Sequence, residues 1–363
     1  MLRKYDYWWS CVQSANTIQL KRIANEVGST KQLYDMSAER LAEISGVSER
    51  LAGIIDSHRR TFNIDKEYET LLKSDIRFIT WYDEDYPDSL REISGSPFAI
   101  FCKGRLPDMN RKSVAIIGAR DCSEYGRMLA ARLGNDLARY GVQIISGMAY
   151  GIDGISQMAA LDAGGDSYGV LGSGVDICYP ASNRRLYSRL IDNGGLISEY
   201  APGTKAVAKH FPLRNRIISA LSDMVIVVEA REKSGTMITV DMALEQGKDV
   251  AVVPGRVTDP LSSGCIKLMK QGAMVITDAE DAMYILDDGF DNSRLRGKNK
   301  LSDIELGAEE RKIYDCLDWY CKNLSRICEE VKMPVSLVIK LLVELQIKGI
   351  VTEVGKGNYV KKS

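Results

Sequence analysis

Two stretches of the chain carry residues suited to binding an anion. The first, Ser113-Val-Ala-Ile-Ile-Gly-Ala-Arg120, is an apolar run followed by a glycine and an arginine. Such a run is typical of a strand buried on both faces, and a strand that turns into a helix offers backbone N–H groups to an anion. The second, Lys209-His-Phe-Pro-Leu-Arg-Asn-Arg216, opens a predicted helix that reaches Leu221. Its arginines suit phosphate oxygens, its asparagine suits a base or sugar, and its phenylalanine can stack on a base.

These residues need a frame that brings them together, and the central part of the chain predicts one. From residue 71 onward, apolar runs such as Val142–Ser146, Tyr168–Leu171 and Met224–Glu229 alternate with helical segments. This alternation predicts a doubly wound, mostly parallel α/β sheet, whose ligands lie beyond the carboxyl ends of its strands. The loops at those ends are rich in glycine and hydroxyl residues, so they predict an anion-binding trough lined by backbone. The candidate residues of the trough are Gly118, Arg120, Ser146, Gly147, Gly151, Gly172, Lys209, Phe211, Arg214, Asn215, Arg216, Ser234, Gly235 and Thr236.

The loops lack the motifs of several common ligands. No Gly-x-Gly-x-x-Gly follows the first strand, and no Gly-x-x-x-x-Gly-Lys-Ser/Thr is present, so neither a dinucleotide nor an ATP site is indicated and no cofactor is expected. No nucleophile–histidine pair is visible. The best candidates for acid–base chemistry are Asp153, Asp176 and Glu199, of which Asp153 is better explained as the cap of the helix that follows it.

Composition sets the remaining limits. A chain of 363 residues predicts two or three domains, and a net charge of −1 means that any attraction for nucleic acid must be local. The 8 cysteines form no Cys-x-x-Cys pair and there are only 2 histidines, so neither a metal site nor a disulfide framework is expected. Because we find no signal peptide and no apolar run long enough to span a bilayer, we expect a cytoplasmic protein without membrane contact.

The two ends of the chain predict smaller domains. Residues 1–70 look helical, and Leu41–Ala52, centred on Gly46 with Ser48 as a cap, has the pattern of a helix-hairpin-helix. A packing role in a helical domain is favoured there over DNA contact. Residues 71–288 form the predicted sheet domain, and residues 289–303 have the composition of a linker.

Residues 304–363 predict a winged-helix domain. Helices are expected over Ala308–Cys321, over Leu324–Val331 and from Pro334 to Lys348, followed by a hairpin of Ile350–Val354 and Asn358–Val360. From Lys332 to Ser363 there are six lysines and two glutamates, which suggests contact with a DNA backbone; a protein-interaction module is the alternative. The candidate DNA contacts are Lys340, Lys348 and Lys356.

The central motifs together resemble the DNA-processing protein A (DprA/Smf) family. The resemblance is carried by Ser113–Arg120, Ile145–Asp153, Val170–Pro180 with Asn183, Gly195–Tyr200, Phe211–Ile218, Val228–Ala230, Ser234–Thr236 and Val253–Gly255. It implies an extended Rossmann-like domain that binds single-stranded DNA, with an accessory N-terminal helical domain of the SAM or helix-hairpin-helix kind.

The same resemblance implies function and partners. A member of this family would load a RecA-type recombinase onto the strand during natural transformation and homologous recombination, without enzymatic activity. It would meet single-stranded-DNA-binding protein and form a homodimer through the Rossmann-like domain. Arg120 and the Phe211–Arg216 motif would contact the DNA. The chain departs from the family pattern at Ser156-Gln157, where the family has Ala-His, and at Cys265-Ile266, where it has Thr-Asn.

Two other functions remain open from the sequence. Related Rossmann-like folds hydrolyse nucleotides, although the region from Lys233 to Thr239 lacks the glycine pair and the glutamate of their loop. A transcriptional regulator with a winged helix and an anion-sensing trough is the third possibility.

Overall fold

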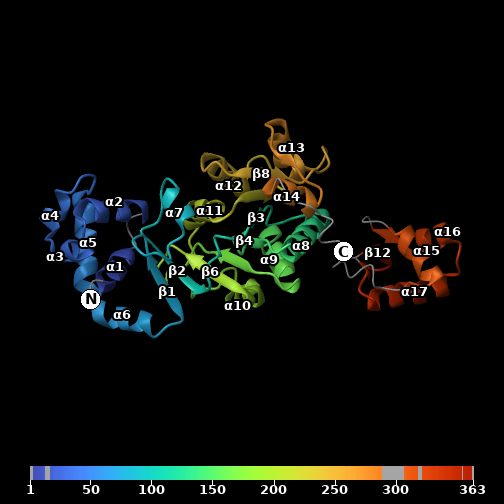
Figure 1. Cartoon of the computed structure of the whole chain (residues 1–363), viewed down its shortest axis with the longest axis horizontal. Coiled ribbons are helices and arrows are strands. Elements are labelled where there is room, and N and C mark those ends of the chain that lie inside the picture. The colour runs from blue at the N-terminus through green and yellow to red at the C-terminus, as the bar shows by residue number, and fades with distance from the viewer. Residues whose placement is uncertain (1–2, 13–16, 288–305, 318–320, 354, 362–363) are drawn as a thin grey trace. The chain divides into compact units, whose positions relative to one another are not determined.

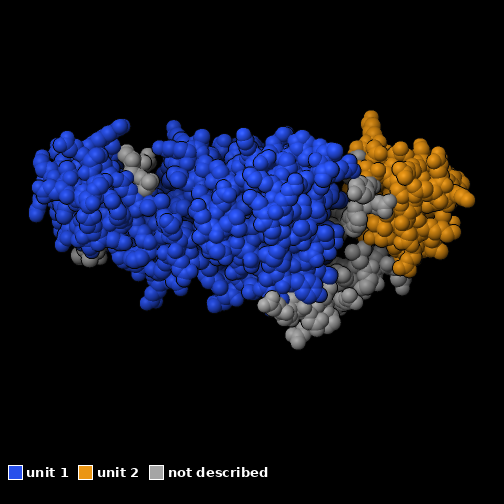
Figure 2. Space-filling model, turned by 90° about the horizontal axis from the view of Figure 1, so that it is seen from above, with its two compact units in different colours: residues 1–288 blue, residues 289–363 orange. Residues whose placement is uncertain are grey.

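The computed structural model describes residues 3–12, 17–287, 306–317, 321–353 and 355–361. The chain divides into two compact units, residues 1–288 and 289–363, which Figure 2 colours separately. The predicted boundary at residue 70 lies within the first unit, and the predicted linker lies outside the described residues. Among the described residues, no helix combines the length and apolarity needed to cross a membrane, and all 8 cysteines are free.

The first unit begins with helices and continues with alternating strands and helices, as Figure 1 shows. Its helices are α1 (Arg3–Ser10), α2 (Thr17–Val27), α3 (Thr30–Asp35), α4 (Ala38–Ala42), α5 (Glu49–Thr61), α6 (Ile64–Leu72), α7 (Asp88–Glu92), α8 (Glu124–Arg139), α9 (Ile152–Asp162), α10 (Arg184–Asp192), α11 (His210–Ala220), α12 (Gly235–Glu245), α13 (Ser263–Lys270) and α14 (Ala279–Leu286), with single 3₁₀ turns η1 (Ala181–Asn183) and η2 (Pro260–Ser262). Its strands are β1 (Ile76–Thr80), β2 (Ala99–Gly104), β3 (Ser113–Ile117), β4 (Gln143–Ser146), β5 (Ser167–Val170), β6 (Gly194–Ser198), β7 (Met224–Val227), β8 (Asp249–Val252) and β9 (Met274–Val275).

The nine strands form one sheet in the order β1-β2-β6-β5-β4-β3-β7-β8-β9. From β6 to β9 in this order all neighbours are parallel, and the antiparallel pairings are those of β2 with β1 and with β6. The predicted mostly parallel sheet is therefore confirmed. The order of the strands along the chain reverses between β3 and β7. In a doubly wound sheet this switch point is where a crevice opens for a ligand.

Alternate residues of β2 and of β6 enter two different cores, one on each face of the sheet. In β2, Phe101 belongs to the core shared with α9 and α10, whereas Ile100 and Cys102 belong to the core under α11, α12 and α13. In β6, Leu196 and Ile197 divide in the same way. Burial on both faces explains why these strands appear in the sequence as uninterrupted apolar runs.

The first of these cores continues into the N-terminal helices. The Tyr7 ring of α1 lies 5.6 Å from the Phe78 ring of β1 and 6.2 Å from the Phe101 ring of β2, measured between centroids. Trp8 and Trp9, both fully buried, belong to the same cluster. The helical segment thus shares its apolar core with one edge of the sheet.

The turn between α4 and α5, where the sequence predicts a helix-hairpin-helix, packs against α2. Ser48 caps α5 as predicted, accepting a hydrogen bond from the Leu51 amide at 3.2 Å. At the turn itself, Arg22 donates to the Ser45 carbonyl at 2.8 Å, and the Ser45 amide donates to Glu26 at 3.3 Å. The Ser45 amide, which could otherwise meet a phosphate, is bound by Glu26 of α2, and this favours the packing role.

The described residues of the second unit form three helices and a three-stranded antiparallel sheet of order β10-β12-β11. The expected helix to Cys321 is too long: α15 ends at Cys316, because Leu317 enters the core with an extended backbone and the Lys322 ammonium binds the Cys316 carbonyl. The elements are α15 (Ala308–Cys316), β10 (Lys322–Asn323), α16 (Leu324–Val331), α17 (Val335–Ile347), β11 (Val351–Glu353) and β12 (Asn358–Lys361).

Candidate nucleic-acid interface

A cavity of about 450 Å³ opens at the switch point between β3 and β7. We call it the strand-end groove. It is formed by the loops after β3 and β7 and by the first turns of α11 and α12. Eight of the predicted trough residues line it: Gly118, Arg120, Phe211, Arg214, Asn215, Ser234, Gly235 and Thr236.

The Phe211 ring lies at the centre of this groove. The guanidinium carbons of Arg120 and Arg214 lie 5.7 and 5.9 Å from its centroid, within the range of a cation–π contact. The ring of Tyr179 lies 5.4 Å away at a tilt of 35°. Gly172 lies under the Phe211 ring, because a Cβ on this glycine would stand 3.0 Å from Cδ1. Sequence reasoning missed Tyr179, whose only signal was an aromatic residue in a glycine-rich strand-end loop.

Arg120 is exposed on a loop that is fixed from below. The Ala119 amide donates to the Glu229 carbonyl at 2.8 Å, and the Glu229 carboxylate accepts a hydrogen bond of 2.9 Å from the Ser123 amide. Ser123 in turn caps α8. The loop after β7 therefore holds the loop after β3, and Arg120 projects from a fixed backbone.

Arg214 lies in the floor of the groove, where it is buried against carbonyl groups of the protein. It is 4% exposed and its Nη1 donates to the carbonyls of Gly147, at 3.0 Å, and Val170. The Gly147 amide donates to Asp153 at 3.1 Å. Burial lowers the pKa of Arg214 to about 10, which leaves it charged at neutral pH, and burial raises the pKa of Asp153 against the opposing charge of Arg214.

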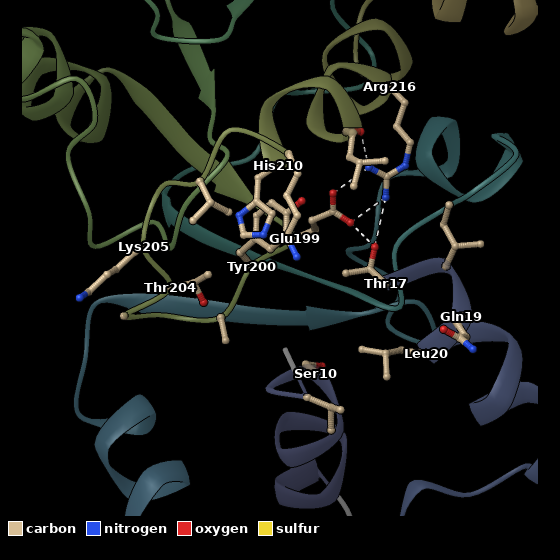
Figure 3. A pocket seen from close by; sticks show the side chains of 17 residues that line it. Ser10, Thr17, Gln19, Leu20, Glu199, Tyr200, Thr204, Lys205, His210 and Arg216 are labelled. Atoms are coloured by element: carbon tan, nitrogen blue, oxygen red, sulfur yellow. Dashed lines mark hydrogen bonds and ion pairs between the residues drawn. The ribbon is translucent and has the colours of Figure 1, made fainter. Parts of the chain in front are cut away.

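Arg216, a predicted trough residue, does not line the groove: it is buried, and its N–H groups are bound by protein. Nη1 and Nη2 each donate to a different oxygen of Glu199 at 2.7 Å. Nε donates to Gly95 at 2.8 Å, Nη1 also to Leu213 at 2.6 Å, and Nη2 also to Thr17 at 3.3 Å. Figure 3 shows Glu199 between Arg216 and Thr17. The arginine joins α2, the loop before β2, the end of β6 and α11.

The other predicted residues support the groove or face away from it. Ser146 is fully buried and its hydroxyl donates to Ile116 at 2.7 Å. Lys209 is exposed, but it lines a neighbouring pocket rather than the groove. Gly151 packs its Cα against the carbonyls of Ala119 and Arg120.

Comparison with known proteins assigns the chain to a family. Residues 77–287 match the family model of DNA recombination-mediator protein A, which covers more than half of the chain. The chain belongs to this family.

Two curated members of the family are similar over most of their length. DNA processing protein DprA of Streptococcus pneumoniae is 38% identical over 249 residues, which cover 67% of this chain and 84% of that protein. DprA of Bacillus subtilis is 42% identical over 207 residues, covering 57% and 70% respectively.

Solved structures of the family agree with the fold. The X-ray structure of S. pneumoniae DprA matches with a TM-score of 0.68 at 32% identity, over 79% of this chain and 98% of that one. DprA from Helicobacter pylori, whose structure describes its single-stranded-DNA binding mode, matches with a TM-score of 0.53 at 29% identity, over 59% and 98%.

The carboxylates considered for catalysis all have structural partners in this member of the DprA family. Glu199 binds Arg216, and Asp176 accepts hydrogen bonds of 3.0 and 2.9 Å from the Gly203 amide. The prediction that Asp153 caps α9 is wrong. The N-cap is Gly151, and the Asp153 carboxylate instead accepts a hydrogen bond from the Gly147 amide. Among the described residues, no cluster of three or more side chains could hold a metal ion.

The departures from the DprA pattern lie in the interior. Gln157 is fully buried, accepts a hydrogen bond from the Met148 amide at 3.0 Å and donates to Tyr168 at 2.9 Å. It thereby holds Met148 at its positive φ of 53°. Ser156 and Cys265 are also buried. These side chains support the loops of the groove without lining it.

Gly151→Ala is expected to destabilise the chain by about 1–3 kcal/mol and to displace the Arg120 loop. Gly151 has φ of 73°, and a Cβ would stand 2.2 Å from the Ala119 carbonyl oxygen and 2.4 Å from that of Arg120. Gly141→Ala is the matched control, because Gly141 has φ of 81° and no atom lies within 4 Å of where its Cβ would stand. Urea unfolding of both variants measures their free energies of unfolding and separates the steric clash, present only in Gly151→Ala, from the backbone strain that both share. If both variants lost the same stability, the expected clash would be contradicted.

Proposed function

We propose that this protein binds single-stranded DNA in the strand-end groove, as a non-enzymatic mediator of recombination. The observation that carries the proposal is the exposed Arg120 guanidinium over the Phe211 ring, at the sheet's switch point. A cation beside an aromatic face suits a nucleotide, because the cation can meet the phosphate while the ring stacks on the base. A stacked base must be unpaired, which favours single strands over duplex.

Polar groups in the groove support the presence of a ligand. Within the described part of the chain, the buried Nε of Arg214 and the buried hydroxyl of Ser234 have no hydrogen-bond partner. Buried donors without a partner are costly, and a bound strand could satisfy them. The N-terminus of α12, at Gly235 and Thr236, adds backbone N–H groups and the positive end of a helix dipole to the same wall.

Arg120→Ala is expected to lower the affinity for oligothymidylate by roughly tenfold and to reduce the slope of log K against log salt by about one. The side chain is exposed, so the variant should unfold at the wild-type urea concentration. Fluorescence anisotropy of labelled oligothymidylate at several salt concentrations measures both quantities.

Arg77→Ala is the matched control, because Arg77 is an exposed arginine on the edge strand β1, outside the groove. It should change the affinity much less. Equal affinities of Arg120→Ala and the wild type would refute binding in the groove.

Membership of the family supports a proposal about partners. We propose that the bound strand is passed to a RecA-type recombinase in natural transformation and homologous recombination, that single-stranded-DNA-binding protein is met on the same strand, and that the chain forms a homodimer through the Rossmann-like domain. The family model, which describes a recombination mediator, supports this assignment.

For the second unit we propose a winged-helix fold with a subordinate role in DNA contact. Lys348 is paired with Glu310 at 2.6 Å, and Lys340 stands 3.8 Å from Glu344. Lys356 is exposed at the tip of the hairpin and is the best placed of the three to meet a phosphate. The outer face of α17 carries exposed apolar residues, which offer nothing to a phosphate: Val335, Ile339, Val343 and Ile347.

A further inference from the structure

A second cavity, of about 720 Å³, lies between the N-terminal helices and the end of β6. Figure 3 shows it with Ser10, Thr17 and Leu20 on one side and Tyr200, Thr204 and His210 on the other. We call it the interdomain pocket. None of its lining residues lines the strand-end groove.

The groove and the pocket share one wall, the segment 204–209. Lys205, Val207 and Lys209 line the pocket, whereas Ala206 and Ala208 line the groove. The segment is fixed at its start, where the Gly174 amide donates to the Thr204 carbonyl at 2.9 Å. Only this single segment of the chain therefore separates DNA bound in the groove from the pocket.

Two lysines lie at the rim of the pocket, and the Asp176 carboxylate nearby is bound to the Gly203 amide. Lys205 and Lys209 are exposed, and none of the described carboxylates forms an ion pair with either within 4.0 Å. The Glu199 carboxylate inside is matched by Arg216, 2.7 Å away, so it does not offset the lysines. Two exposed ammonium groups on one wall suit the phosphates of a chain that crosses it.

The interior of the pocket suits a base. The rings of Tyr200 and His210 are stacked at 3.9 Å with an angle of 16° between their planes, and Val207 and Leu213 add apolar surface. Burial lowers the pKa of His210, which favours its neutral form. Thr204 is 8% exposed, and its buried hydroxyl has no hydrogen-bond partner among the described residues. An apolar, aromatic pocket with one unpartnered hydroxyl can hold a planar group with polar edges.

We propose that the interdomain pocket is a second nucleotide subsite, which takes an unpaired base of the strand held in the groove while Lys205 and Lys209 bind the phosphates that cross the shared wall. This inference rests on the proposed function of the groove. It extends the DNA path from the switch point of the sheet to the N-terminal helices.

Val207→Glu tests the subsite, because it places a bulky negative charge in the pocket at a position that is 40% exposed. The probes are labelled oligothymidylates of increasing length and thymidine monophosphate. For the wild type, affinity should rise by a step of roughly tenfold once the oligonucleotide is long enough to cross the wall. Val207→Glu should bind the short oligonucleotides like the wild type and lack the step. Val257→Glu, which adds the same charge at an 85% exposed position lining neither cavity, should keep it.

Two results would overturn the subsite. The first is a wild type without a step, and the second is a Val207→Glu variant that retains the step. If that variant retains the step but no longer binds thymidine monophosphate, the pocket serves a free nucleotide instead. Failure of the proposed function looks different: oligothymidylates of every length would then bind Arg120→Ala as well as the wild type.

Discussion

Arg216→Ala is expected to lower the free energy of unfolding of the first unit by about 3–5 kcal/mol, because it leaves the Glu199 carboxylate buried without its counter-charge. The side chains of the pair are 7% and 2% exposed, and the other acceptors of the guanidinium, on Gly95, Leu213 and Thr17, are uncharged oxygens. Desolvated charges of this kind depend on each other far more than surface pairs do. Urea unfolding followed by tryptophan fluorescence measures the loss.

Two controls separate the buried pair from arginine removal in general. Arg127→Ala removes a half-exposed arginine whose partner, Glu124, stands 3.5 Å away on the surface of α8, and it should cost about 0–1 kcal/mol. The double variant Arg216→Met/Glu199→Leu removes both charges and should recover much of the stability. If Arg216→Ala unfolded with the wild type, the arginine would not hold these segments together.

Phe211→Ala is expected to lower the affinity for oligothymidylate by about 1–3 kcal/mol, the value of one base stacked on an aromatic ring. The Phe211 ring contacts the side chains of Arg120, Arg214 and Tyr179. Its removal therefore takes away the aromatic face on which a base would stack and the contacts that these three side chains share. Fluorescence anisotropy with labelled oligothymidylate measures the change.

Phe211→Leu and an abasic oligonucleotide distinguish stacking from packing. The leucine side chain keeps apolar volume over Gly172 but has no π face. The Phe211→Leu variant should therefore lose most of the affinity for oligothymidylate that Phe211→Ala loses. With an abasic strand, wild type and both variants should bind alike. Two results would show that the Phe211 ring serves only in packing. One is a Phe211→Leu variant that binds oligothymidylate with wild-type affinity. The other is a loss of affinity in the variants that is as large for the abasic strand as for oligothymidylate.

The sheet and the location of the groove could be predicted because both depend on local sequence. Apolar runs such as Ser113–Ile117 and Met224–Val227 are buried strands, and small residues such as Gly118 and Ser234-Gly235 mark the turns after them. Parallel strands place all such turns at one edge. This reasoning alone gives five of the residues that line the groove: Gly118, Arg120, Ser234, Gly235 and Thr236.

The roles of Arg214 and Arg216 could not be predicted, because they depend on distant partners. The sequence shows two arginines at the start of a helix, where a cation opposes the helix dipole and a bound anion is the natural explanation. In the structure, Arg214 meets carbonyls that lie 67 and 44 residues away, and Arg216 meets a carboxylate 17 residues away.

Helix periodicity also fails to predict the exposure of Tyr125. The spacing of four residues between Tyr125 and Leu129 predicts that both lie on the buried face of α8, yet Tyr125 is 40% exposed.

The aromatic contact between α1 and the edge hairpin has a consequence for any shortened version of the chain. A fragment restricted to the family-matched span, residues 77–287, would leave Phe78 and Phe101 without the Tyr7 ring and Arg216 without Thr17. Its edge hairpin would then present aromatic surface beside unpaired strand edges, a combination that favours aggregation. The segment that the family model matches is therefore shorter than the compact unit to which it belongs. That unit also includes the helices before residue 77.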